Sequence, residues 1–186
     1  MNKFLLTVAA VFLTGFTACS QKGEQNDMNK THRTLVAYFS ATGTTARAAH
    51  IIADVTGSEL FVIDPQIPYS NADLNWHDKQ SRSSVEMDNP KARPALKLTH
   101  EEIADYDTVF IGYPIWWDLA PRIINTFIES HDLQGKILIP FATSGGSGIA
   151  NSVNALKKEY PALQWRDGKL LNRTDRETVK EWIEKL

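Results

Sequence analysis

Short apolar runs alternate with amphipathic segments along most of this chain, from about residue 34 to the last residue. Runs of five to nine residues that are rich in Val, Ile, Phe and Tyr are typical of buried strands. The last run is interrupted by Asp167 and Gly168. The expected strands cover residues 35–39, 59–63, 106–113, 136–141 and 163–171.

Amphipathic helices are expected between and after these strands. Gly57 stands where a glycine closes the first helix, and Pro121 stands where proline commonly begins one. The last helix is expected to begin with Thr174 as its N-cap and Glu177 as the partner in a capping box. The expected helices cover residues 44–55, 121–128, 149–158 and 174–186.

Strands that alternate with helices indicate a parallel sheet covered by helices on both faces. Five strands in one domain of this length fit the doubly wound order 2-1-3-4-5 of a three-layer α/β fold. In such a sheet, ligands bind beyond the carboxyl ends of the strands, at the switch between strands one and three. Three loops should meet there, namely residues 40–45, 114–117 and 143–147.

Residues 66–94 form a polar stretch that is too long for a tight connection, and such stretches are often functional or partly helical. Residues 71–87 could hold a helix. The stretch could cover a ligand, or it could be an insertion that packs on the edge of the sheet. The side chains that could contact a ligand are Tyr69, Trp76, His77 and Arg82.

The first residues are typical of a targeting segment rather than of a folded domain. Lys3 precedes an apolar run from Phe4 to Phe16, which is too short to span a bilayer comfortably. Small residues then precede Cys19 in a pattern that resembles a bacterial lipobox. We expect residues 1–18 to be a signal peptide and Cys19 to be lipidated, which would anchor an exported lipoprotein to a membrane. An ordinary secretory signal with a soluble periplasmic product is the alternative.

Composition narrows the classes of function. Residues 19–33 are polar and are expected to form a flexible tether before a folded domain at 34–186. The formal net charge of -2 argues against nucleic-acid binding. The only cysteine lies at the end of the targeting segment, so it can form no internal disulfide and cannot serve a cysteine phosphatase. The five His residues lack metal-binding spacing, so no metal site is expected.

Hydroxyl side chains and one glycine follow the first expected strand and lead into a helix. The first N–H groups of a helix lack internal partners and attract a phosphate. This loop has no Lys and a single Gly, so it is neither a P-loop nor a dinucleotide-binding loop. A plain turn with an N-cap is the alternative interpretation. The candidate phosphate ligands are Ser40, Thr42, Gly43, Thr44 and Thr45.

The two later loops add an aromatic pair and a Gly-rich backbone. Adjacent side chains point in different directions, so only one of the two indoles is expected to face a ligand. The glycines allow a flat ring to approach the backbone closely. A tryptophan packed in the core and a simple solvent turn are the alternatives. The candidate residues are Pro114, Ile115, Trp116, Trp117, Thr143, Ser144, Gly145, Gly146 and Ser147.

The motif at 40–45 and the order of the later loops resemble the flavodoxin-like family over residues 34–186. The resemblance implies FMN as the cofactor, with its phosphate held by the first loop. It also implies that residues 115–117 offer backbone amides to the flavin ring and that residues 143–147 meet its pyrimidine end. Residues 68–94 resemble a branch of the family described as NAD(P)H-dependent oxidoreductases.

The expected function is therefore that of an FMN-binding redox protein, either an electron carrier or an oxidoreductase that uses NAD(P)H or another donor and a quinone-like acceptor. No catalytic side chain is expected, because the flavin itself can accept a hydride. The loop at 114–117 lacks the Gly that carrier flavodoxins often have there, which favours two-electron chemistry. A net charge near zero also weakens a carrier role. A flavin-free binding or scaffold module on the same fold is the alternative.

Overall fold

The computed structural model describes residues 32–97, 103–172 and 175–186. The predictions for the signal peptide, for Cys19, for most of the tether and for Thr174 fall on residues outside these ranges. Among the described residues, no helix combines the length and the apolar character that crossing a bilayer requires.

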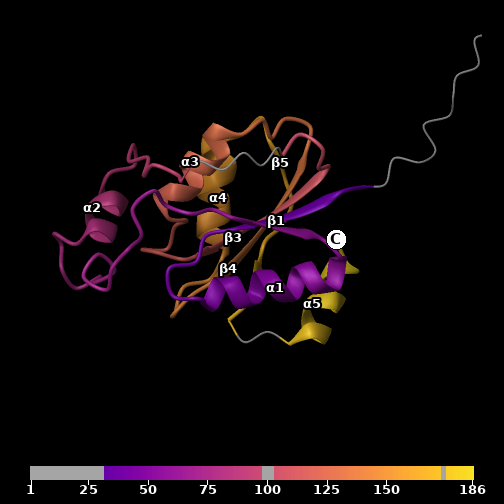
Figure 1. Cartoon of the computed structure of the whole chain (residues 1–186), viewed down its shortest axis with the longest axis horizontal. Coiled ribbons are helices and arrows are strands. Elements are labelled where there is room, and N and C mark those ends of the chain that lie inside the picture. Colours follow the sequence, from indigo (N-terminus) through magenta and orange to yellow (C-terminus); the bar gives the residue numbers. More distant parts are fainter. Residues whose placement is uncertain (1–31, 98–102, 173–174) are drawn as a thin grey trace, which may run out of the picture. The chain divides into compact units, whose positions relative to one another are not determined.

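A parallel sheet forms the centre of the domain, with the order β2-β1-β3-β4-β5 (Figure 1). This confirms the α/β flavodoxin-like fold and the order 2-1-3-4-5 expected from the sequence. The strands are β1 (Thr34–Tyr38), β2 (Glu59–Val62), β3 (Thr108–Pro114), β4 (Ile137–Thr143), β5 (Gln164–Trp165) and β6 (Lys169–Leu170). The helices are α1 (Thr44–Thr56), α2 (Arg82–Asp88), α3 (Arg122–Ser130), α4 (Ala150–Glu159) and α5 (Arg176–Ile183).

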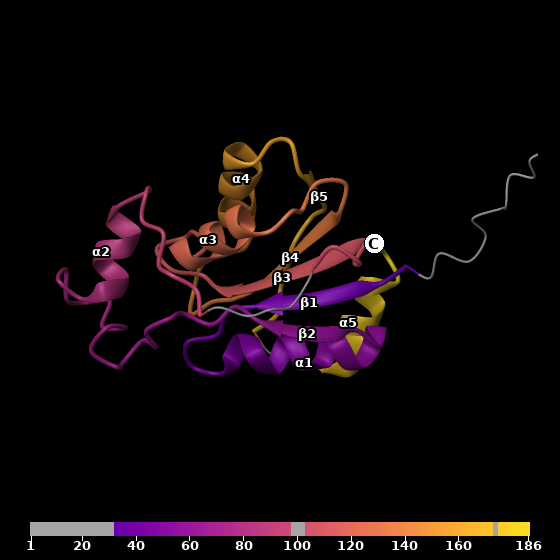
Figure 2. The same ribbon diagram turned by 45° about the horizontal axis from the view of Figure 1, so that its top comes forward.

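Alternate residues of the strands pack against helices on opposite faces of the sheet. Val36 and Tyr38 belong to the apolar cluster that contains side chains of α1 and α5. Leu35 and Ala37 belong to the cluster that contains side chains of α3 and α4. Figure 2 shows the two pairs of helices on either side of the sheet. The central strands β1 and β3 are therefore buried on both faces, as their continuous apolar runs predict.

The expected fifth strand is divided into two strands, β5 and β6, which both pair with β4. The break lies opposite Pro140 of β4. The carbonyl oxygens two residues before and two residues after Pro140 accept hydrogen bonds from the segment that contains β5 and β6. The backbone of Pro140 therefore points toward the same segment, but proline has no N–H to donate to it. A side-chain carbon at Gly168 would lie 3.0 Å from the Pro140 carbonyl oxygen, so glycine permits the close approach at the break.

Two helices begin at least two residues later than expected. Within residues 71–87 the helix begins only at Arg82, where the hydroxyl of Ser81 caps it. The residues before it form consecutive turns in which Ser, Asn and Asp side chains accept hydrogen bonds from the backbone. Such local bonds compete with helix formation. In the last helix the N-cap is Asp175, whose carboxylate accepts a hydrogen bond from the first turn.

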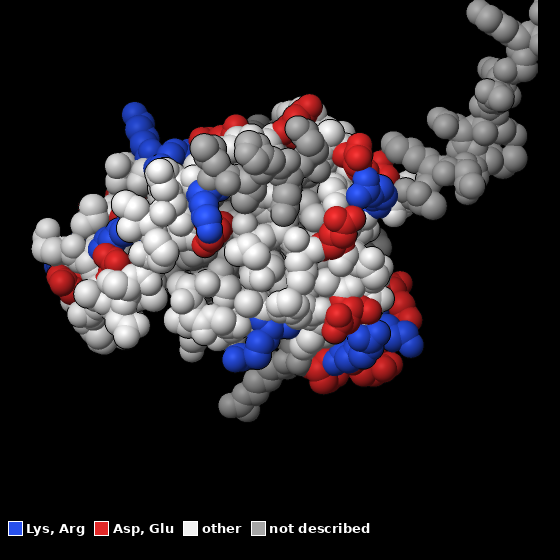
Figure 3. Space-filling view, viewed as in Figure 1, with Lys and Arg blue, Asp and Glu red and all other residues white. Residues whose placement is uncertain are grey.

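Charges of both signs are mixed on the face of the domain shown in Figure 3. Among the described residues drawn there, blue and red side chains lie in small adjacent groups, and uncharged surface separates them. This face therefore presents no continuous patch of one sign that would steer a highly charged partner.

Candidate functional site

Loops from the carboxyl ends of β1, β3 and β4 meet around one cavity of about 560 Å³. Parallel pairing explains the meeting, because it places these strand ends along one edge of the sheet. The lining residues that the sequence analysis named are Thr42, Pro114, Ile115, Trp116, Trp117, Ser144, Gly145, Gly146 and Ser147, together with Trp76 from the long insertion. Ala41, Leu74 and Ser83 also line the cavity and were not named.

The first loop places free backbone donors at the start of α1. Gly43 has a φ of 85° and precedes the first helical residue, and the Ser40 hydroxyl accepts hydrogen bonds from the N–H groups of Gly43 and Ala46. Among the described residues, the N–H groups of Thr42, Thr44 and Thr45 have no acceptor. The first turn of α1 also carries no acidic side chain. Free donors and the helix dipole together favour an anion here.

Two of the predicted hydroxyl side chains do not line the cavity. Thr45 and Thr143 are both buried, and their hydroxyl oxygens are 2.8 Å apart. This hydrogen bond ties the first loop to the third. Ser40, Gly43 and Thr44 also lie outside the lining, whereas their neighbours Ala41 and Thr42 line the cavity. The Ser40 hydroxyl and the left-handed backbone of Gly43 shape the loop.

The second loop holds its two indoles in different environments, as expected for adjacent side chains. Trp116 packs edge-on against Phe39 and Tyr69, with ring centroids 5.6 Å and 5.4 Å apart. Trp117 is 47% exposed. Both indoles nevertheless line the cavity, whereas only one of them was expected to face it.

Trp117 and Asp118 both adopt left-handed backbone conformations, with φ values of 46° and 65°. They occupy the tip of a tight turn closed by two 3.0 Å hydrogen bonds between Trp116 and Leu119. A non-glycine residue in this region costs about 1–2 kcal/mol, so the surrounding structure must hold the turn in place. Such strain is typical of functional sites.

Most backbone amides of this loop are already engaged. The Ile115 N–H donates to the carbonyl oxygen of Thr143 at 2.8 Å, and the Trp116 N–H donates to Leu119. Of the three amides that the family resemblance assigned to the flavin, only that of Trp117 has no acceptor among the described residues. The engaged amides instead join the second loop to the third and close the turn.

The third loop is shaped by one hydroxyl and one distant amide side chain. The Ser144 hydroxyl accepts hydrogen bonds from the N–H groups of Gly146 and Ser147. The Ser144 N–H donates to the side chain of Asn172, which follows β6 and was missed in the sequence because no local pattern links the two residues. A side-chain carbon added at Gly145 or Gly146 would meet no atom within 4 Å, so open space lies above both glycines.

The long insertion supplies the remaining wall of the cavity. Trp76 lines the cavity, as expected if the insertion covers a ligand, whereas Tyr69, His77 and Arg82 do not. Tyr69 lies behind Trp116, where burial, followed by a hydrogen bond to Glu86, raises its pKa far above the ordinary value. Tyr69 is therefore a neutral packing residue. Within the described ranges, no three His, Cys, Asp or Glu side chains are grouped as metal ligands would be.

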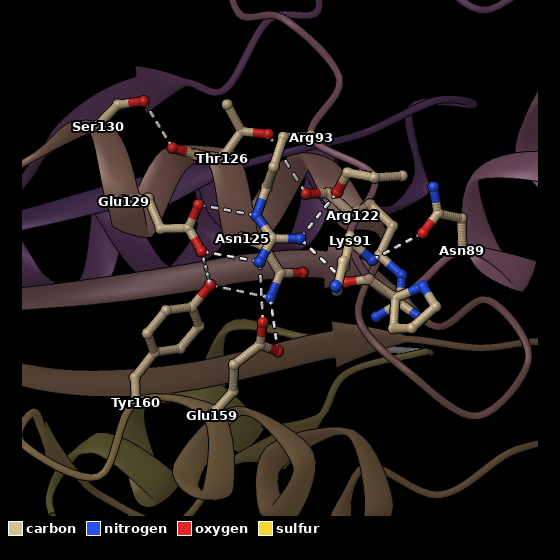
Figure 4. A network of polar contacts seen from close by, with 12 residues as sticks. Asn89, Lys91, Arg93, Arg122, Asn125, Thr126, Glu129, Ser130, Glu159 and Tyr160 are labelled. Atoms are coloured by element: carbon tan, nitrogen blue, oxygen red, sulfur yellow. Dashed lines mark hydrogen bonds and ion pairs between the residues drawn. The ribbon is translucent and has the colours of Figure 1, made fainter.

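Arg93 fastens the end of the insertion to α3 and α4 (Figure 4). Its guanidinium makes two 2.8 Å hydrogen bonds to the Glu129 carboxylate and one of 2.9 Å to Glu159. The Tyr160 hydroxyl donates to Glu129, and the amide of Asn125 donates to Glu159. Forked contacts of this kind fix orientation as well as adding energy. We call these five side chains the Arg93 clamp.

We expect Arg93→Met to lower the free energy of unfolding and to change its dependence on pH. The hydrogen bond from Arg93 is the main reason that the pKa of Glu129 lies below its ordinary value of 4.5. A carboxyl group with a lowered folded-state pKa adds stability above its unfolded pKa, and that stability is lost as the pH falls through the folded pKa. Urea unfolding should therefore show a difference between variant and wild type that shrinks below pH 4.5.

Lys157→Met is the matched control for this variant, because it removes a single pair with the fully exposed Asp167. Exposed pairs contribute little, so this control should leave the unfolding curve almost unchanged at every pH. A difference for Arg93→Met that stays constant from neutral pH to well below 4.5 would show that Glu129 gains nothing from the clamp.

Comparison with known proteins adds to these observations. A sequence profile described as flavodoxin matches residues 33–186. A crystallised protein from Bacteroides eggerthii that is assigned to the flavoproteins is 61% identical, over 82% of this chain and 96% of that one, with a TM-score of 0.80. A similarly assigned protein from Bacteroides uniformis is 58% identical, over 82% of this chain and 98% of that one, with a TM-score of 0.81.

A more distant structure shares the fold. It is a flavoprotein from Lactobacillus acidophilus in complex with FMN, and it is 22% identical over 82% of this chain and 99% of that one, with a TM-score of 0.63. The search of curated proteins found no match.

Proposed function

Because this chain belongs to the flavodoxin family, we propose that its cavity binds FMN and that the bound flavin makes the domain a redox protein. The observation that carries the proposal is the meeting of three loops around one cavity at the switch point of the sheet. The cavity volume of about 560 Å³ lies within the range of small-molecule sites. The complex of the Lactobacillus acidophilus protein with FMN supports the choice of ligand.

The residues around the cavity fit the two ends of FMN. The free N–H groups of Thr42, Thr44 and Thr45 lie at the positive end of α1 and would hold the phosphate. The exposed indole of Trp117 and the uncovered backbone of Gly145 and Gly146 offer flat surfaces for the ring. When bound, FMN supplies electron-transfer and hydride-transfer chemistry.

The hydrogen bonds of the second loop bear on whether the domain is an oxidoreductase or an electron carrier. The amides of Ile115 and Trp116 are held by internal hydrogen bonds, so the second loop would present a fixed donor at Trp117 instead of changing partners during the reaction. A loop held in this way favours two-electron transfer over one-electron transfer. We therefore favour an oxidoreductase, with a redox donor and a redox acceptor as its partners, over an electron carrier.

Titration of the purified protein with FMN, followed by flavin fluorescence or calorimetry, tests the proposal. We expect binding at one site with micromolar affinity or tighter, and weaker binding of riboflavin, because riboflavin lacks the phosphate that the start of α1 would hold. A protein that takes up neither FMN nor riboflavin would instead be the binding or scaffold module that shares this fold.

We also propose that the chain is exported and anchored to a membrane through lipid on Cys19, with a soluble periplasmic protein as the alternative. The basis is the sequence alone, with Lys3, the short apolar run and the small residues before Cys19. Mass spectrometry of the mature N-terminus would show whether it begins at Cys19 and carries acyl chains.

A further inference from the structure

A second hollow, with a volume of about 970 Å³, lies beside the cavity of the proposed FMN site. Trp76 and Trp117 line both of them, and residues 76–89 form most of the wall of the second hollow. α2 lies at one end of the domain, apart from the helices that cover the sheet (Figures 1 and 2). Residues 70–95 are all described, and none of them belongs to either apolar cluster of the core. This segment therefore adds little to the core, and its exposed side chains are free to contact a ligand.

The wall of the second hollow is fastened to the rest of the domain. The Arg82 guanidinium lies 4.0 Å from the centre of the Tyr69 ring. The Arg122 side chain donates to the Met87 carbonyl oxygen at 3.0 Å, and the Arg93 clamp holds the end of the segment. The wall is thus formed before any ligand arrives, which lowers the entropic cost of binding.

Polar side chains make up most of the lining and provide both donors and acceptors of hydrogen bonds. Six of the ten lining residues are polar or charged. Among the described residues, the ammonium of Lys79, the side-chain amide of Gln80 and the carboxylate of Asp88 have no hydrogen-bond partner. The charges of Lys79 and Asp88 are opposite, so the lining favours a neutral ligand. A hydroxyl group both donates and accepts, so a ligand rich in hydroxyl groups can satisfy both kinds of side chain.

Two indoles add flat apolar faces to this polar lining. Trp76 is 66% exposed and stacks on His77 with ring centroids 3.5 Å apart, and Trp117 is 47% exposed at the tip of its closed turn. The face of an aromatic ring carries partial negative charge. A sugar ring turns several C–H groups, which carry partial positive charge, toward one side, so that side can stack on an indole.

The combination of the two features distinguishes a sugar from other ligands. A flat aromatic molecule could also stack on the indoles, but it would leave most polar groups of the lining without partners. Polar groups that lose water without gaining a partner cost free energy. An open-chain polyol could satisfy the polar groups, but it has no rigid apolar face for the indoles. A sugar ring provides an apolar face and a rim of hydroxyl groups together.

We infer that this hollow binds a neutral oligosaccharide, with its sugar rings on the two indoles and its hydroxyl groups on the polar side chains of the lining. The volume is close to the upper end of the range of small-molecule sites, which favours more than one sugar ring. This ligand is additional to the FMN proposed above, and its binding does not require that FMN be bound.

Calorimetric titration of the purified protein, with and without FMN, tests the inference. The ligands are cellotetraose, xylotetraose, mannotetraose and tetra-N-acetylchitotetraose, which present sugar rings with different substituents. At least one of them should bind at one site with a Kd of about 1 mM or below. Sorbitol, which has no ring, and tetragalacturonate, which carries a charge on every ring, should bind more weakly. Failure of all these neutral tetrasaccharides to bind overturns the inference, as does equally tight binding of sorbitol or tetragalacturonate.

The double variant Gln80→Ala and Asp88→Ala should bind the best tetrasaccharide about tenfold more weakly or worse, because two partners of its hydroxyl groups are lost. FMN affinity should stay unchanged, because neither residue lines the cavity of the FMN site. Asp88 is the last residue of α2, where a carboxylate opposes the helix dipole, so its removal should not harm the helix. The circular dichroism spectrum should therefore match that of the wild type.

The matched control is the double variant Asp54→Ala and Gln164→Ala, which removes the same kinds of side chain from exposed positions that line neither hollow. It should bind the tetrasaccharide and FMN as the wild type does. Normal tetrasaccharide binding by the Gln80 and Asp88 variant, or equal losses in both double variants, overturns the inference. FMN uptake without tetrasaccharide binding overturns this inference alone, whereas tetrasaccharide binding without FMN uptake overturns the proposed function alone.

Discussion

Gly112→Ala is expected to destabilise the protein by about 1–3 kcal/mol, because it would overpack the interior. Gly112 lies in β3 beside Phe141 of β4, whose ring is fully buried. A side-chain carbon at Gly112 would lie 2.1 Å from the tip of that ring and 2.5 Å from the next atom. Neither group can move away without disturbing the packing of the sheet against α1 and α5. Urea unfolding followed by circular dichroism measures the effect.

Two further variants separate this steric conflict from the general effect of adding a methyl group. Gly145→Ala places the same group where no atom lies within 4 Å, so its unfolding curve should match that of the wild type. Phe141→Leu should recover part of the stability that Gly112→Ala loses, since residues in contact have non-additive effects. Equal losses for the two alanine variants would show that the ring is not the cause.

Thr44→Asp is expected to stabilise the protein and at the same time to weaken FMN binding about a hundredfold. Thr44 is the first residue of α1, whose first turn has no acidic side chain. A carboxylate there complements the helix dipole and adds about 0.3–1 kcal/mol. The same carboxylate would compete with the phosphate for the free N–H groups and repel it. Thermal unfolding and FMN titration should therefore change in opposite directions.

Riboflavin provides an internal control for Thr44→Asp, because it has no phosphate to repel and should bind the variant and the wild type alike. His50→Glu adds a negative charge to an exposed position further along α1 and should alter neither measurement appreciably. If FMN and riboflavin lost affinity equally, the phosphate would not lie at the start of α1.

The architecture of the domain could be predicted because it depends on local patterns. Continuous apolar runs mark strands buried on both faces, and alternation with helices imposes a parallel sheet. The order 2-1-3-4-5 then places three loops at one edge, and residues from all three line the cavity. In the sequence, only Asp167 and Gly168 indicated that the last strand is divided. Pro140, which lies opposite the break, belongs to another strand.

The details of the site depended on contacts between residues far apart in the chain. Thr45 was predicted from its hydroxyl to bind a ligand, yet that hydroxyl is buried, forms a hydrogen bond with that of Thr143 and does not line the cavity. Asn172 shapes the third loop without any pattern that could reveal it. The insertion was recognised as a long polar segment, but its turns and its short helix follow from its own hydrogen bonds, and the Arg93 clamp holds its end.

By itself, the sequence determined the order of strands and helices, the edge of the sheet where the three loops meet and the family to which the chain belongs. These features depend on hydrophobic periodicity and on short motifs, and both are formed by residues that are close together in the sequence. Only the tertiary structure decided which amides of the loops remain free, which hydroxyls are buried and where Trp76 and Trp117 face. Those outcomes depend on partners brought together by folding, and no local pattern records such partners.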